Sequence, residues 1–299
     1  MHRPVLAVDI GGSKCAAALV DGATVLAQRR VATPTADGPE AVADAVAALA
    51  REVLARARAA PTALGIACAG QVREGRAWAL SPELLPGWHG FAIERALRER
   101  LDLPTHALND GHAAALGEAR HGAGRGRPSM LFVTVSTGIG GGLVLGDRLW
   151  PGRLGVAGHL GYVCADPDGP IAAIGRPGVL ESVASGTALA RRAAAAGQPA
   201  DARAVIEAAD AGEPWAEDLI GAAVAALARA LVDVQTVVAP DVVVLGGGVG
   251  LNPSFRRRLI AALAAAPETL RPEVVAAALG DSAGLVGAAA WAGEASAAG

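Results

Sequence analysis

The stretch LAVDIGGSKCAAALVDGATVL, residues 6–26, joins an apolar run, a turn of glycine and small residues, a second apolar run and an Asp-Gly turn. The same order returns in LFVTVSTGIGGGLVLGDRLW, residues 131–150. Each stretch predicts a β-hairpin, because short apolar runs bounded by Gly and Asp are typical of paired strands. Two copies of one hairpin in a single chain indicate two lobes of related architecture.

The rest of the chain alternates short apolar runs with longer stretches of helical period. Residues 39–59 predict an amphipathic helix, and residues 63–70 (ALGIACAG) predict a strand. THALND, residues 105–110, predicts a further strand, and the helix expected in GHAAALGEARHG follows it directly. The sequence therefore predicts an α/β protein in which Asp110 stands at the carboxyl end of a strand.

The 299-residue chain is 52% hydrophobic and has a formal net charge of −3. This apolar content is ample for one large core or two medium ones, and the small net charge provides no attraction to nucleic acid or to an anionic membrane. The apolar runs are short and interrupted, whereas a membrane span needs about 20 residues. Because the chain begins with a strand instead of a signal peptide, we expect a cytoplasmic protein without nucleic-acid or membrane partners.

The three cysteines are scattered along the sequence. Cys15, Cys68 and Cys164 form no CxxC pair, so neither a disulfide framework nor a cysteine metal site is expected. We expect each of them to be a small buried residue.

The two glycine turns carry the first chemical signal. A glycine turn between strands lets backbone N–H groups approach an oxyanion without interference from a Cβ atom, and hydroxyls such as Ser13 and Thr137 add donors. A single glycine turn is as easily explained as the closure of a hairpin. Two turns with the same layout favour a polyphosphate site. The P-loop pattern is absent, and residues 246–250 lack the third glycine of a dinucleotide-binding turn.

Six short segments occur in the order found in the ROK family of sugar kinases. They are DIGGSK (9–14), ND (109–110), STGIGGG (136–142), GH (158–159), LE (180–181) and VVLGGGVG (243–250). The chain resembles this family over nearly its full length. Within the family, the segments TVSTGIGGGLV, AGHLGY, ADPDGP and ESVASG look most like those of bacterial N-acetylmannosamine kinases.

The resemblance implies an actin-like ATPase fold with two ribonuclease-H-like lobes, each a mixed β-sheet flanked by helices. The smaller N-terminal lobe is expected to comprise residues 1–115 and 286–299. The larger C-terminal lobe is expected to comprise residues 116–285, with the active site in the cleft between the two lobes. The implied reaction is the ATP-dependent phosphorylation of the 6-hydroxyl of N-acetyl-D-mannosamine in sialic acid catabolism. Mg²⁺ as cofactor and a homodimer as the working form are implied with it.

Individual roles follow from the same resemblance. Asp110 would bind the sugar and take the proton from its hydroxyl, and Asp9 would face Mg²⁺ through water. Asn109, His159 and Glu181 would hydrogen-bond other sugar hydroxyls. The remaining implied nucleotide- and phosphate-binding residues are Gly11, Gly12, Ser13, Lys14, Thr137, Gly138, Gly140, Gly246, Gly247 and Gly248. Asp110 also suits the N-cap of the helix that follows it, and His159 an ordinary loop position.

Two departures from the family pattern change the expectations. Members commonly bind a structural zinc with the Gly-His histidine and three cysteines, whose places here hold Ala172, Ile174 and Val179. A closed zinc site takes four ligands, so we expect no zinc and a loop held by apolar packing and its prolines. In addition, Leu84 stands where the family carries a sugar-binding asparagine, so one sugar contact is missing or is supplied by another residue.

Two other functions stay open at this point. The chain could phosphorylate another hexose, N-acetylglucosamine or glucose, and a sugar sensor without catalytic activity would keep every glycine turn. A ROK repressor is not expected, because no DNA-binding module precedes Asp9. The presence of Asp110 favours an enzyme over a sensor.

Overall fold

The computed structural model describes residues 4–57, 59–80, 85–172 and 174–298, so the expectation for Leu84 lies outside the described residues. The chain divides into two compact units. Unit 1 comprises residues 1–125, 149–157 and 281–299, and unit 2 comprises residues 126–148 and 158–280. The expected lobe boundary at 115/116 falls inside helix α3 (Asp110–His121), which unit 1 keeps whole. We call Leu149–Ala157, which no sequence pattern assigned to unit 1, the crossover segment.

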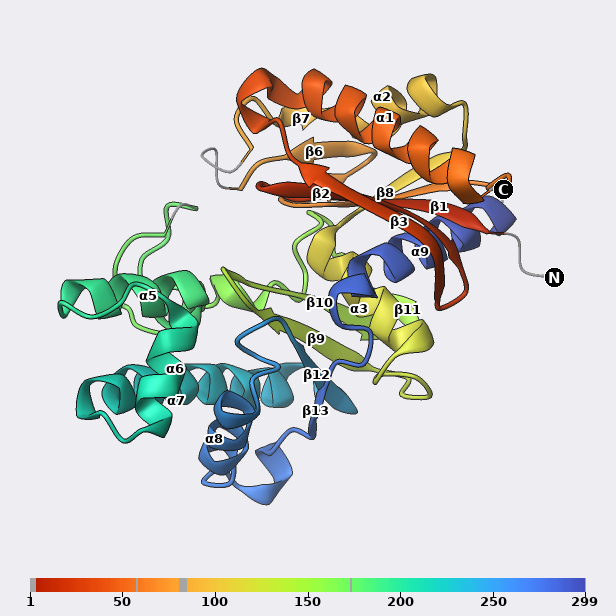
Figure 1. The fold of residues 1–299 in the computed structure, drawn as a ribbon. Coiled ribbons are helices and arrows are strands. Elements are labelled where there is room, and N and C mark those ends of the chain that lie inside the picture. Colours follow the sequence, from red (N-terminus) through yellow and green to blue (C-terminus); the bar gives the residue numbers. More distant parts are fainter. Residues whose placement is uncertain (1–3, 58, 81–84, 173, 299) are drawn as a thin grey trace. The chain divides into compact units, whose positions relative to one another are not determined.

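Unit 1 is built on a five-stranded sheet in the order β3-β2-β1-β4-β8 (Figure 1). β1, β2 and β3 are antiparallel, whereas β4 and β8 run parallel to β1. The predicted hairpin of β1 and β2 is therefore confirmed, and β3 extends it by a third antiparallel strand. The bounds are β1 (Val5–Ile10), β2 (Lys14–Asp21), β3 (Thr24–Ala32), β4 (Leu64–Cys68) and β8 (Thr105–Asn109), and a small sheet adds β5 (Gln71–Arg73), β6 (Arg76–Trp78) and β7 (His89–Phe91).

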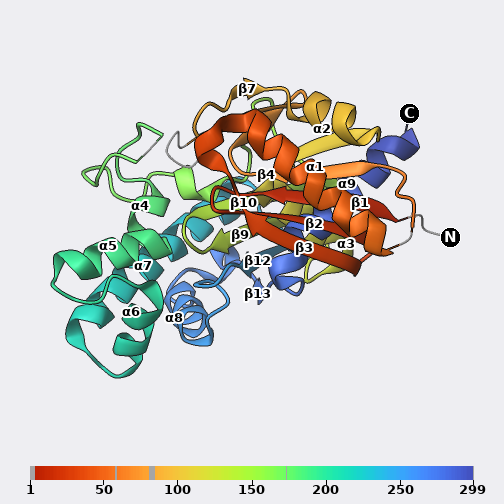
Figure 2. The same ribbon diagram turned by 45° about the horizontal axis from the view of Figure 1, so that its top comes forward.

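Helices cover both faces of this sheet (Figures 1 and 2). One face is covered by α1 (Gly38–Ala57) and α2 (Ile93–Leu101), whose apolar residues join the strands in one buried core. The other face carries α3 and α9 (Ala283–Ala298). These two helices cross at small residues, because a Cβ atom on Gly287 would lie only 1.6 Å from the carbonyl oxygen of Ala113. Glycine at this crossing lets the backbones touch.

Unit 2 repeats the sheet of unit 1. Its strand order is β11-β10-β9-β12-β13, with β9 and β10 antiparallel and with β12 and β13 parallel to β9. The strand order matches that of unit 1, and so do the directions of β9, β10, β12 and β13. The predicted duplication of the hairpin is therefore confirmed. The bounds are β9 (Met130–Val135), β10 (Ile139–Leu145), β11 (Arg148–Leu149), β12 (Val242–Gly246) and β13 (Val274–Ala276).

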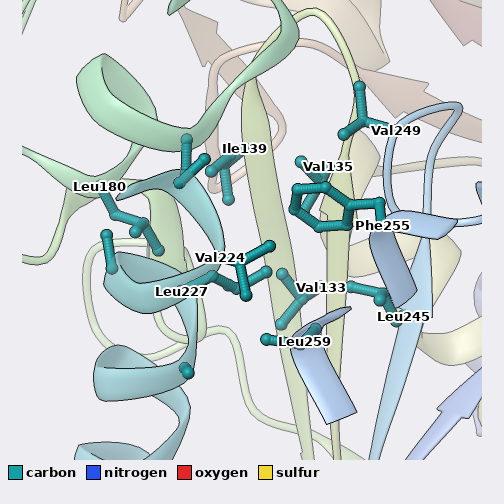
Figure 3. Packing of buried hydrophobic residues seen from close by; sticks show 14 of the residues in the cluster. Val133, Val135, Ile139, Leu180, Val224, Leu227, Leu245, Val249, Phe255 and Leu259 are labelled. Carbon is teal, nitrogen blue, oxygen red and sulfur yellow. The ribbon is translucent and has the colours of Figure 1, made fainter. Parts of the chain in front are cut away.

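The helices of unit 2 pack against this second sheet. Figure 3 shows Val133 and Val135 of β9 pointing toward side chains from α7 and α8, among them Val224 and Phe255. Each large apolar side chain buried in this way stabilises the fold by about 1.5–3 kcal/mol. The helices are α4 (Leu180–Ala184), α5 (Gly186–Ala195), α6 (Ala202–Asp210), α7 (Pro214–Val237) and α8 (Pro253–Leu263), and short 3-10 turns occupy Thr35–Asp37, Leu160–Tyr162, Glu268–Leu270 and Gly280–Ser282.

The expectation that no apolar stretch is long enough to span a membrane needs one correction. Helix α7 is long and apolar enough to cross a membrane by length and composition alone, although its sequence is interrupted by charged residues. Its residues Ile220, Val224, Leu227 and Leu231 are buried in the core of unit 2. A core helix passes the same test of length and composition, and these buried residues place one face of α7 in the core of unit 2.

Candidate functional site

The first glycine turn connects β1 to β2 and is tied to the end of β3. The N–H of Gly11 donates to the carbonyl oxygen of Lys14 (3.1 Å), which closes the turn. Thr33, which follows β3, binds this turn through two hydrogen bonds. Its hydroxyl donates to the carbonyl oxygen of Gly11 (2.7 Å), and its N–H donates to the carbonyl oxygen of Ser13 (3.1 Å). Thr33 was not foreseen, because a contact between residues 22 positions apart leaves no local pattern.

Asp9 faces a small polar cavity within unit 1. The cavity has a volume of about 170 Å³ and is lined by Asp9, Lys14, Ala16, Arg30, Asp281 and Leu285. Burial raises the pKa of Asp9 to about 7, with a further contribution from Asp110, while Lys14 and Arg30 oppose the rise. The predicted residues Asp9 and Lys14 thus share one cavity, and Arg30 and Asp281 join them without any signal in the sequence.

Asn109 and Asp110 form one hydrogen-bonded unit at the start of α3. The helix is capped by Asn109, whose Oδ1 accepts from the N–H of His112 (3.1 Å), so the capping role considered for Asp110 belongs to its neighbour. Asn109 Nδ2 donates to the carbonyl oxygen of Gly70 (2.7 Å) and to Asp110 Oδ1 (2.8 Å). With both N–H groups of its amide engaged, Asn109 keeps only its oxygen for a sugar and acts chiefly by holding Asp110.

Asp110 itself is exposed at the end of β8. Desolvation by the surrounding protein raises the pKa of its carboxyl, and hydrogen bonds from the N–H of Gly111 (2.8 Å), from Asn109 and from the N–H of Asp110 itself oppose the rise. Gly111 and Asn109 both bind Oδ1, so the second oxygen can accept from a ligand. An exposed carboxylate in a fixed orientation has the geometry that a general base requires.

The second glycine turn connects β9 to β10. The N–H of Ser136 donates to the carbonyl oxygen of Gly138 (2.9 Å), and the N–H of Ile139 donates to Glu181 Oε2 (2.7 Å). A Cβ atom on Gly138 would lie 2.4 Å from that same carboxylate oxygen, so a larger residue here would displace the Glu181 side chain. Glu181, expected at the sugar, therefore contacts the second glycine turn.

The third glycine segment, residues 246–248, lies at the end of β12. Two of its glycines are packed closely against other residues, and one is exposed. A Cβ atom on Gly246 would lie 2.9 Å from the ring of Phe132, and Gly247, at φ +82°, passes so close to β9 that its Cβ would lie 2.4 Å from the carbonyl oxygen of Val135. Gly248 is exposed and has no heavy atom near its would-be Cβ. Close packing explains the first two, and the third is free to face a ligand.

Gly248 and Thr137 line a larger cavity of about 650 Å³ within unit 2. The N-termini of α6 and α8 border it through their capping residues, since Asp201 accepts from the N–H of Ala204 and Asn252 from that of Phe255. Helix N-termini favour negative charge. The remaining walls include Thr187, Arg203, Ile206 and Val249. Of the other predicted glycines, Gly138 lies in the adjoining turn and Gly140 in β10, and neither lines the cavity.

The loop that resembles a zinc site is closed by its own backbone. The N–H of Ala172 donates to the carbonyl oxygen of Arg176 (2.9 Å), and that of Gly178 donates to Pro170 (2.9 Å). Of the three residues in the cysteine places, Val179 is buried but Ala172 and Ile174 are only half-buried, so the apolar packing that we expected holds one end of the loop. Among the described residues, no group of three or more His, Cys, Asp and Glu side chains could hold a metal ion.

His159 precedes a 3-10 turn, and its ring stacks on Tyr162 with the centroids 4.4 Å apart. The cysteine expectation holds for Cys15 and Cys68, which are buried, and is wrong for Cys164, which is exposed in this loop. The predicted site residues thus form one group in unit 1, at Asp9, Asn109 and Asp110, and another in unit 2 around the second and third glycine segments.

Comparison with known proteins identifies the family. Residues 5–295 match the ROK family. The chain belongs to this family. The ROK glucokinase of Streptomyces griseus, solved with glucose and the ATP analogue AMPPNP, is 34% identical with a TM-score of 0.80, over 97% of this chain and 99% of that one. The fold is accordingly the actin-like ATPase fold of ROK sugar kinases.

Curated relatives narrow the comparison. The N-acetylmannosamine kinase of an Escherichia coli strain is 39% identical over 285 residues, which is 95% of this chain and 96% of that protein. The bifunctional enzyme NanE/NanK of Brucella melitensis is 43% identical over 288 residues, 96% of this chain. The chain spans about half the length of that bifunctional relative, 53%.

Proposed function

We propose that this protein is a kinase that transfers the γ-phosphoryl group of ATP to the 6-hydroxyl of N-acetyl-D-mannosamine. The observation that carries the proposal is the arrangement at Asp110, an exposed carboxylate held through one oxygen at the start of α3. Kinases named for this sugar among the relatives support the choice of substrate. The reaction would serve the catabolism of sialic acid.

Asp110 performs the proton transfer. Its carboxylate accepts the proton of the sugar 6-hydroxyl while the hydroxyl oxygen attacks the γ-phosphorus, and the bond from that phosphorus to the bridging oxygen of ADP breaks. The products are the sugar 6-phosphate, ADP and a proton. The hydrogen bonds from Asn109 and Gly111 keep the attacking geometry fixed, which lowers the entropy cost of the step.

The residues around Asp9 suit Mg²⁺ as the metal. Asp9 is a carboxylate without a hydrogen bond among the described contacts, and it faces a cavity that also holds the carboxylate of Asp281. Mg²⁺ keeps several waters and binds through one or two carboxylates together with substrate phosphates. When bound, the ion would neutralise phosphate charge, and Lys14 and Arg30 add positive charge at the same cavity.

The cavity of unit 2 is the proposed place of the nucleoside. Its volume of about 650 Å³ lies in the range of small-ligand sites, and its mixed walls offer apolar contact with a few polar groups. Thr137 and the turn that follows it supply N–H and hydroxyl donors for phosphate. We place His159 and Glu181 at the sugar.

A coupled assay of ADP formation tests the proposal. The sugars are N-acetylmannosamine, N-acetylglucosamine and glucose, and Asp110→Asn is expected to lower kcat by about 10³-fold, within the usual range for a lost general base. Asp102→Asn is the matched control, because Asp102 has a left-handed backbone that Asn also tolerates. Equal ADP formation by wild type and Asp110→Asn would refute the role of Asp110.

The same panel decides between the alternatives. A clear preference for glucose would replace the proposed sugar, and sugar binding without any ADP formation would favour a sensor. We also infer that the protein works in the cytoplasm as a homodimer, as its family resemblance and its buried thiols Cys15 and Cys68 support. Light scattering after size-exclusion chromatography measures the subunit number, and a monomer would contradict the inference.

A further inference from the structure

His112 is a buried histidine that the mechanism above does not use. It lies in the first turn of α3, is 1% exposed, and has Nε2 2.7 Å from the carbonyl oxygen of Ala157. A carbonyl oxygen only accepts hydrogen bonds, so Nε2 must carry the proton and donate it. Burial lowers the pKa of His112, which favours the neutral ring, while the bond to Ala157 works in the opposite direction.

Ala157 is the last residue of the crossover segment, which is anchored to unit 1 at two further points. Gln71 Nε2 donates to the carbonyl oxygen of Leu154 (2.5 Å). Gly155, at φ +69°, passes β5 so closely that a Cβ atom there would lie 2.3 Å from the carbonyl oxygen of Val72. His112 thus provides the final anchor before the chain returns to unit 2.

The next residue is fixed to the other unit. Gly158 belongs to unit 2 and lies against β10, where a Cβ atom on it would be 2.7 Å from the N atom of Leu143. His159, which the proposed function places at the sugar, follows directly. One peptide bond therefore separates the residue held by His112 from a residue packed against β10.

We propose that His112 is a positioning residue for the sugar: it links the helix turn that carries Asp110 to the chain that leads into His159. This inference rests on the proposed function. The path runs from Asp110 through one turn of α3 to the imidazole, across the hydrogen bond to Ala157, and along two peptide bonds to His159. The positions of the general base Asp110 and of the sugar-binding His159 then both depend on the imidazole of His112.

The consequence is selective for the sugar. Loss of the donor leaves the carbonyl of Ala157 without its partner and frees the end of the crossover segment, while the residues that line the cavity of unit 2 keep their contacts. A small misplacement of reacting groups lowers a rate by about 10²-fold. The Michaelis constant for the sugar and kcat should change, and the Michaelis constant for ATP should not.

Three variants test the proposal in the full-length protein. His112→Leu removes the donor at similar volume, His112→Gln replaces the imidazole by another N–H donor, and His106→Leu repeats the substitution on a half-buried histidine of β8. We expect His112→Leu to raise the sugar KM about tenfold and lower kcat about tenfold or more, with ATP KM within about twofold. His112→Gln should recover most of the loss, and His106→Leu should behave as wild type.

Equal losses in His112→Leu and His112→Gln, or an increase in ATP KM as large as that in sugar KM, would overturn the proposal. If His112→Leu does not fold, side-chain ¹⁵N spectra of the wild type decide, with His112 assigned by comparison with His112→Gln. A neutral ring protonated at Nε2 is expected, and protonation at Nδ1 would refute the hydrogen bond. A wild type that binds but does not phosphorylate the panel sugars refutes the proposed function alone, because calorimetric sugar binding still reports on His112.

Discussion

Replacing Asp9 by asparagine should stabilise the ligand-free protein while weakening its catalysis. The carboxyl of Asp9 is desolvated by the surrounding protein, lies within the field of Asp110, and has a pKa of about 7 against 3.8 in the unfolded chain. A carboxyl whose pKa is raised on folding destabilises the native state whenever the unfolded chain is ionised. The substituted asparagine would keep the shape of the side chain and remove the charge that the fold must desolvate.

The magnitude follows from the two pKa values. At about 1.4 kcal/mol for each pH unit between them, 3.8 and about 7 correspond to about 4 kcal/mol as an upper limit. Asp9 is only half-buried and faces a polar cavity, so screening reduces the expected gain to about 2 kcal/mol. Below pH 4 both states hold the proton and the gain disappears. It grows as the pH rises from about 4 to about 7 and is complete above that.

Urea unfolding of wild type and Asp9→Asn at pH 4, 6 and 8, without nucleotide or divalent cation, measures this difference. Asp21→Asn, at the far end of β2, is the control for loss of an aspartate charge from the same hairpin. Addition of Mg²⁺ and ATP should stabilise the wild type more than Asp9→Asn, which reverses the order. A free-energy difference that stays constant from pH 4 to pH 8 would refute the reasoning.

Three further predictions follow from the contacts. Gly138→Ala places a methyl group 2.4 Å from Glu181 Oε2, so steady-state kinetics should give an ATP KM raised about tenfold or more. Gly287→Ala, whose Cβ would meet the Ala113 carbonyl at 1.6 Å, should destabilise by about 3 kcal/mol or more in thermal unfolding. Elemental analysis should find no bound zinc, and EDTA should leave the melting temperature unchanged; a stoichiometric zinc ion would contradict the expectation for Ala172, Ile174 and Val179.

The fold was predictable where neighbours in sequence are also neighbours in structure. Both glycine hairpins and the helix from Gly38 to Ala57 were expected because strand and helix periods are local properties of the chain. The crossover segment Leu149–Ala157 was not expected. It joins unit 1 through Gln71 and the close approach of Gly155 to β5, and neither contact produces a periodic pattern.

The residue types of the candidate site were predictable from the sequence. The hydrogen-bond partners of those residues were less predictable. Asp110 was placed at the carboxyl end of a strand, and it directly follows β8. The sequence could not show which of the adjacent residues Asn109 and Asp110 caps the helix, because both residue types suit an N-cap. The structure shows that Asn109 caps the helix through its Oδ1, while its Nδ2 bonds to Gly70, 39 residues away, which no local pattern indicates.

Glu181 illustrates why a single role for each residue is too simple. Its place in the LE segment implies a sugar contact, yet one carboxylate oxygen accepts from the N–H of Ile139, next to Gly138, where a Cβ atom would displace this side chain. This bond joins residues 42 positions apart and makes Glu181 part of the second glycine turn. If a sugar also contacts Glu181, as we propose, its binding and the conformation of this turn would be coupled through one side chain. No pattern confined to either segment could reveal the bond between Glu181 and the turn.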